Sequence, residues 1–111
     1  MIGDMTLRYS KEQLHQITEQ AMIYMCACPA QVAGQLMALR ELYGYQRNCS
    51  NKASVMGQVH QRIAQATRLA HAELESCLDD VLALEGWDKA TLTMPEGLRQ
   101  LRNQLIESGP D

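Results

Sequence analysis

Apolar residues recur at steps of three and four along residues 11–27, which is the period of one face of an α-helix. The residues in this stripe are Leu14, Ile17, Ala21, Met25 and Cys28. Ser10 and Gln13 precede the stripe with the spacing of a capping box, in which each side chain binds a free backbone N–H at a helix start. The pattern therefore predicts a first helix over about 11–27 with one face against a core.

A second helix is predicted over about 29–47. Pro29 favours a corner at its start, because proline lacks an N–H, restricts the residue before it and suits the first turn of a helix. Four residues form the apolar face of this helix: Val32, Leu36, Leu39 and Tyr43. Residues 48–54 are polar and have no apolar period, which is typical of a connection between helices.

The longest apolar period covers residues 55–85 and predicts a third helix that ends before Gly86, a common helix stop. Its apolar residues are Val55, Val59, Ile63, Ala66, Ala70, Leu74, Cys77, Val81 and Leu84. Thr93 and Glu96 have the spacing of a second capping box. We expect a short fourth helix over about 94–107 and a frayed tail over 108–111.

Short connections between successive helices favour antiparallel neighbours. The expected fold class is all-α: an antiparallel up-and-down helical bundle of three long helices plus a short C-terminal fourth helix. Residues 1–111 are expected to form a single helical domain. At 1.5 Å per residue the third helix would reach about 45 Å, against about 25 Å and about 30 Å for the first two. The third helix should therefore extend beyond its neighbours.

The composition is that of an ordinary globular domain, with 46% hydrophobic and 21% charged residues in a chain of 111. A net charge of -3 with scattered basic residues argues against nucleic acid as a partner. The first ten residues lack the pattern of a signal peptide, and the apolar stretch 21–33 is shorter than the roughly 20 residues of a bilayer crossing. We expect a cytoplasmic protein that does not enter a membrane.

Cys26, Cys28 and Cys77 are the candidate metal ligands. In the expected bundle, Cys77 lies about 33 Å along the third helix and so returns toward the corner at Cys28. No Cys-x-x-Cys motif is present, and cysteine is among the most frequently buried residue types. Ordinary core or interface thiols without a cofactor are therefore the main interpretation, and zinc or copper(I) on these thiolates is the alternative.

No residue set predicts catalysis, so we expect a chain that is not an enzyme. His71 and Glu75 lie one helical turn apart, and the charged residues around them predict a solvated surface pair. Glu12 and His15 match one half of the di-iron motif of ferritin-like bundles, but the second carboxylate–histidine pair is missing.

The expected function is that of a small helical interaction module that self-associates, with a dimer favoured and another protein as a further possible partner. Two features support this: the overlong third helix, and the apolar residues on more than one face of 21–33. Ile23, Cys26 and Trp87 are the candidate interface residues, although Trp87 could instead cover the end of the bundle. The alternative is a thiolate metal-binding or redox-sensing protein that uses Cys26, Cys28 and Cys77.

Overall fold

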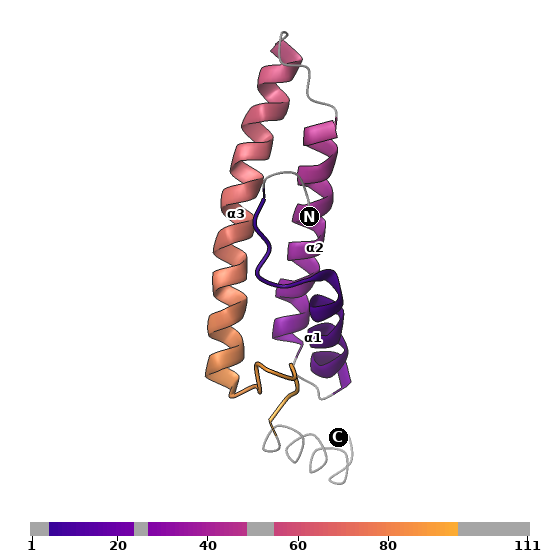
Figure 1. The fold of residues 1–111 in the computed structure, drawn as a ribbon, viewed down its shortest axis with the longest axis vertical. Helices are drawn as coiled ribbons and strands as arrows, with labels where there is room; N and C mark the ends of the chain where they lie inside the picture. Colours follow the sequence, from indigo (N-terminus) through magenta and orange to yellow (C-terminus); the bar gives the residue numbers. More distant parts are fainter. Residues whose placement is uncertain (1–4, 24–26, 49–54, 96–111) are drawn as a thin grey trace, which may run out of the picture.

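The computed structural model describes residues 5–23, 27–48 and 55–95, and it contains three α-helices (Figure 1). These are α1 (Lys11–Ile23), α2 (Cys28–Asn48) and α3 (Val55–Glu85). No strand occurs within these ranges, so the all-α class is confirmed. None of the described helices has the length and apolar character that crossing a membrane would require. The predicted fourth helix lies almost entirely outside the described residues.

The helix starts follow local sequence. At the start of α1, the Gln13 N–H donates to Ser10 Oγ (3.1 Å) and the Ser10 N–H donates to Gln13 Oε1 (2.7 Å), which confirms the capping box. The prediction that this helix continues to residue 27 is wrong, because Ala27 is outside α1 and its carbonyl accepts the first hydrogen bond of α2, from Gln31 (2.9 Å). Pro29 lies in the first turn of α2, where its missing N–H costs no hydrogen bond.

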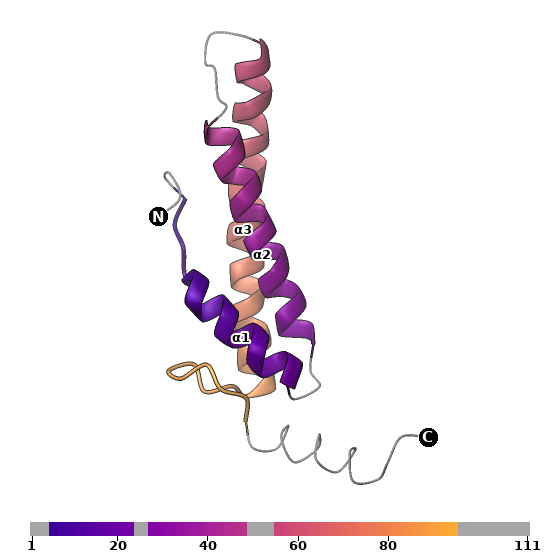
Figure 2. The ribbon, with the colours of Figure 1, turned by 90° about the vertical axis from the view of Figure 1, so that its right-hand side faces the viewer.

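The three helices have unequal lengths, of about 20, 32 and 46 Å at 1.5 Å per residue. Consecutive helices run in opposite directions, with α1 packed on α2 and α2 packed on α3 (Figure 1). Figure 2 shows α1 against one side of the lower half of the α2–α3 pair. No other described helix covers the upper half of that pair, which contains the end of α2 and the start of α3.

The main core occupies the lower half of the molecule, where all three helices meet the segment that follows α3. Gly86, with φ of 78°, ends α3 in the left-handed conformation that glycine adopts without strain. Hydrogen bonds from Met94 N–H to Gln20 (3.1 Å) and from Gln16 to the Leu92 carbonyl (3.4 Å) then hold the segment against α1. The buried residues of this core are Tyr9, Leu14, Ile17, Ala21, Ala33, Leu36, Leu78, Leu82, Trp87, Leu92 and Met94.

The buried face of α3 is rotated relative to the predicted one. Its buried residues are Gly57, Ala64, Thr67, His71, Glu75, Leu78 and Leu82. From Ala64 to Leu82, each lies one position after a residue of the predicted stripe, which is a rotation of about 100° around a helix. The polar members remain buried because they have partners inside the fold: Thr67 Oγ1, for example, donates to the Ile63 carbonyl (2.7 Å).

Two further predictions of burial differ from the structure. On α2, Arg40 and Gln46 are buried, whereas Val32 and Leu39 are half-buried. Cys28, which was assigned to the core face of the first helix, is the exposed first residue of α2. The fold therefore buries a set of partnered polar side chains and leaves part of its apolar surface outside.

Candidate functional site

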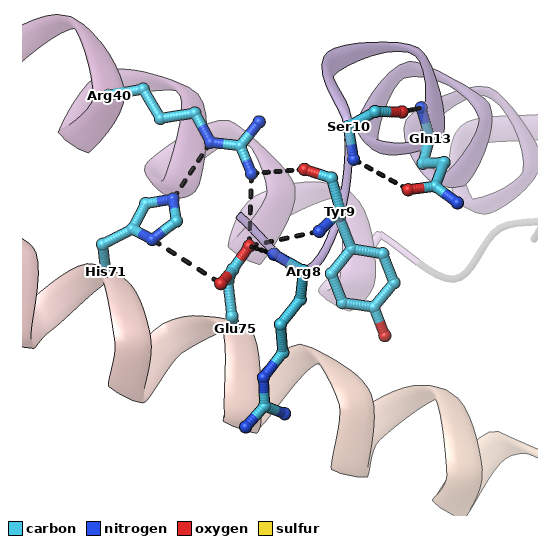
Figure 3. Close-up of polar contacts among 7 residues, drawn as sticks. All are labelled: Arg8, Tyr9, Ser10, Gln13, Arg40, His71 and Glu75. Atoms are coloured by element: carbon cyan, nitrogen blue, oxygen red, sulfur yellow. Dashed lines mark hydrogen bonds and ion pairs between the residues drawn. The ribbon is translucent and has the colours of Figure 1, made fainter. Parts of the chain in front are cut away.

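A cluster of buried polar side chains connects α2, α3 and the N-terminal segment (Figure 3). His71 and Glu75 of α3 have exposed fractions of 0% and 2%, and Arg40 of α2 lies against both. Arg40 Nη2 is 3.2 Å from Glu75 Oε2, and Arg40 Nε donates to His71 Nε2 (3.0 Å). The prediction that His71 and Glu75 form a solvated surface pair is therefore wrong, because both side chains face α2 in the interior.

The cluster also holds the chain that precedes α1. Glu75 Oε2 accepts hydrogen bonds from the backbone N–H groups of Arg8 (2.9 Å) and Tyr9 (3.3 Å). Arg40 Nη2 donates to the Tyr9 carbonyl (2.6 Å). Arg40 was not among the residues predicted from the sequence, although a charged residue four positions after Leu36 and three before Tyr43 falls within the apolar period of α2. That placement is the signal that could have identified it.

Tyr9 adds a contact at the edge of the cluster, where its hydroxyl donates to Asp79 Oδ1 (3.0 Å). Burial of the phenol and, to a smaller extent, this hydrogen bond raise the pKa of Tyr9 to about 12. Lys89 Nζ donates to the same Asp79 oxygen (2.9 Å), and its hydrogen bond, with that from Tyr9, lowers the pKa of Asp79. Asp79 therefore remains ionised and joins the N-terminal segment to the loop after α3.

The hydrogen bond from Arg40 determines the state of the His71 ring. Because Nε2 accepts this bond, the single proton of the neutral ring is assigned to Nδ1. Nδ1 lies 3.7 Å from Glu75 Oε1, which is too long for a hydrogen bond, and it has no other hydrogen-bond partner within the described ranges. Burial lowers the pKa of His71; the charge of Glu75 opposes this shift and that of Arg40 adds to it.

Acidification should therefore destabilise the fold through His71. The unfolded chain takes up a proton on this residue near pH 6.5, whereas the folded chain does so only at lower pH, so stability is complete above about pH 6.5 and is lost as the pH falls below it. One proton gives at most about 1.4 kcal/mol per pH unit. Urea unfolding at pH 7.5, 6.5 and 5.5 measures this slope, and the slope should decrease in His71→Gln. An equal slope in that variant would contradict the assignment.

The exposed apolar side chains occur mainly on the α2–α3 pair. The larger ones there are Leu42, Tyr45, Val55, Met56, Val59, Leu69 and Leu84. A groove of about 500 Å³ runs between the two helices and is lined by Leu39, Leu42, Arg62, Ile63, Ala66, Thr67 and Ala70. Arg62 is the one charged residue in this lining. The arrangement is suited to binding an apolar surface and offers no nucleophile activated by a neighbouring base.

This groove and α1 lie on different faces of the α2–α3 pair. Met37 of α2 lines a hollow together with Leu7 and Lys11, on the face that α1 and the N-terminal segment cover. Leu39 of α2 lines the groove instead. Because residues two positions apart point about 200° away from each other on a helix, the groove opens on nearly the opposite face.

The predicted thiol site is only partly within the described residues. Cys28 is an exposed free thiol and Cys77 is a half-buried free thiol, whereas Cys26 lies outside the described ranges. Within those ranges, no group of three or more histidine, cysteine or acidic residues could hold a metal ion. The proposed set of three thiols needs Cys26, so a metal or redox site remains a prediction.

The predicted interface residues are in different environments. Ile23 is exposed at the end of α1, and Cys26 lies outside the described residues. Trp87 is only 6% exposed, packs in the main core, and donates its indole N–H to Glu85 Oε1 (2.8 Å). Its side chain therefore covers the end of this chain's own core, as expected in the alternative to an interface role.

Comparison with protein-family models, with curated proteins and with solved structures found no match. Function must therefore be inferred from the surfaces and side chains of the chain itself. The buried cluster fixes the fold, because its groups bind one another and the N-terminal backbone. The apolar groove is the feature that faces outward.

Proposed function

We propose that the chain is a non-enzymatic interaction module that self-associates, as a dimer, through the groove face of the α2–α3 pair. One observation carries this proposal: the apolar stripe of α3 lies about 100° away from the face that α3 buries in its own chain. Val55 is 73% exposed at one end of the stripe and Leu84 is 86% exposed at the other. Burial of such surface contributes about 25 cal/mol per Å², which favours a partner.

The composition of the groove favours a helix as the occupant. Ala66 and Ala70 lie one turn apart in its lining, and small side chains allow two helices to approach closely. Larger apolar residues, Leu39 and Ile63, border them, and Arg62 supplies a polar edge, as in other protein interfaces. A second copy of α3 would supply the helix that the upper half of the pair lacks. The dimer would then complete an antiparallel up-and-down bundle.

Static light scattering across micromolar concentrations tests this proposal, and the expected mass is twice that of one chain. Val59→Glu should weaken the dimer by at least about tenfold, because a carboxylate in the apolar contact loses its hydration. Val59 is exposed in the single chain, so the helical circular dichroism should not change. Gln58→Glu, which places the same charge on the adjacent exposed position, is the matched control and should remain dimeric.

A wild-type chain that stays monomeric over this range would overturn the proposal. A Val59→Glu variant that dimerises as tightly as the control would show that self-association uses another surface.

A further inference from the structure

We propose that the two copies of α3 pair antiparallel about a two-fold axis near Arg68, with Arg62 of each copy beside Glu73 of the other. This inference rests on the proposed self-association and specifies its geometry. It is based on the order of side-chain sizes along the apolar stripe of α3, part of which is exposed, and on the two charges at the edge of that stripe.

The stripe has matching residues on either side of Arg68. Ala66 and Ala70 are equally far from Arg68 along the chain, and so are Val59 and Cys77, as well as Val55 and Val81. Ile63 lies five positions before Arg68 and Leu74 lies six positions after it, so their distances from Arg68 differ by one position. An antiparallel two-fold pairing places the members of each set opposite each other, because residues at equal distances from the axis meet.

The sizes of these side chains favour this register. Ala66 and Ala70, the small pair, are at the centre, where the two helix axes would come closest, at about 8 Å. Ile63 and Leu74 lie one turn further out on either side. Both are half-buried in their own chain, Leu74 against the main core, and their exposed parts would lie beside the small residues. A shift of the register by one turn would place Ala70 opposite itself on the axis and Leu74 opposite Ala66, so that the four alanines of the two copies would no longer lie together. The proposed register is therefore the one that brings all four alanines together where the helices approach most closely.

The charges distinguish antiparallel from parallel pairing. Arg62 and Glu73 are both exposed and lie on the same edge of the stripe, because eleven residues make almost a whole number of helical turns. Neither has an oppositely charged residue three or four positions away in α3. In the antiparallel register, each Arg62 meets Glu73 of the second copy, so that two ion pairs form. A parallel pairing would place this edge of the two helices on opposite sides of the pair, so that Arg62 of one copy would not reach Glu73 of the other.

Charge reversal tests the register directly. Arg62→Glu alone and Glu73→Arg alone should each raise the dimer dissociation constant about tenfold at low ionic strength, because two exposed ion pairs of up to about 1 kcal/mol become repulsive. The double variant Arg62→Glu/Glu73→Arg should return to within about threefold of the wild type. Sedimentation equilibrium measures all four proteins. Arg47→Glu, an exposed residue of α2, makes the same change in net charge away from the stripe and is the control.

The outcomes separate the two proposals. A dimeric wild type with weakened single variants and a restored double variant supports the register. A dimeric wild type with unaffected single variants, or with a double variant as weak as the single ones, would overturn the register and leave self-association standing. A monomeric wild type would overturn the proposed function itself.

Discussion

Glu75→Ala is expected to lower the free energy of unfolding by about 3–5 kcal/mol, which is the cost of removing one partner from a buried ion pair. The substitution leaves the guanidinium of Arg40 in the interior without its counter-charge. It also removes the acceptor for the backbone N–H groups of Arg8 and Tyr9. Urea denaturation at pH 7.5 measures the loss, with the far-UV circular dichroism of the helices as the signal.

Asp80→Ala is the matched control, because Asp80 is an exposed carboxylate on the same helix. Its effect should stay within about 0.5 kcal/mol. The double variant Arg40→Met/Glu75→Leu should be less destabilised than Glu75→Ala, because it leaves neither charge buried alone. A loss below about 1 kcal/mol for Glu75→Ala would mean that water reaches Arg40 and that the cluster contributes little to stability.

Leu78→Ala and Leu84→Ala should differ by several kcal/mol, although both remove the same atoms from the same helix. Leu78 is fully buried in the main core, so its truncation should cost about 2–5 kcal/mol. Leu84 is exposed, so its truncation should change stability by less than about 0.5 kcal/mol. Urea unfolding of both variants, at a concentration where the chain is monomeric, determines which face of α3 is the core.

The sequence pattern alone makes a different forecast, because Leu84 belongs to the apolar stripe and Leu78 does not. A larger loss for Leu84→Ala than for Leu78→Ala would therefore restore the predicted face and contradict the packing described above.

Features that depend on neighbouring residues could be predicted from the sequence. The capping box of Ser10 and Gln13, the proline in the first turn of α2 and the glycine after α3 each act within a few residues. The length of α3 followed from its sustained apolar period. The end of α1 was predicted less well, because the apolar spacing continues through Met25 and Cys28, although Ala27 lies outside α1 and its carbonyl accepts the first hydrogen bond of α2.

The core face of α3 could not be predicted by counting apolar residues, because that count treats every polar residue as exposed. His71 and Glu75 are buried since Arg40, some thirty residues earlier, supplies both a hydrogen bond and a counter-charge. A polar contact of this kind between two helices cannot be recognised from the spacing of apolar residues in either helix alone. The charged residue within the apolar face of α2 was the available clue.

The features of the candidate site were likewise predicted from the sequence only in part. The overlong third helix was expected from the sequence, and it supports the proposed self-association. The apolar surface left for a partner was expected on residues 21–33, whereas much of it lies on α3. The attachment of residues 8 and 9 to Glu75 was missed, since backbone groups carry it and no side-chain motif marks it. Trp87 was predicted either to cover the end of the bundle or to bind a partner. Its burial in the main core favours the first of these roles.

The hydrogen bonds between Glu75 and the backbone of Arg8 and Tyr9 also affect the order in which the protein assembles during synthesis. These residues leave the ribosome before their acceptor, which is 67 and 66 positions further along the chain. The two helices of the α2–α3 pair, by contrast, are neighbours in the chain and close a short loop. We therefore expect the segment that contains Arg8 and Tyr9 to dock late, onto an α2–α3 pair that has already formed.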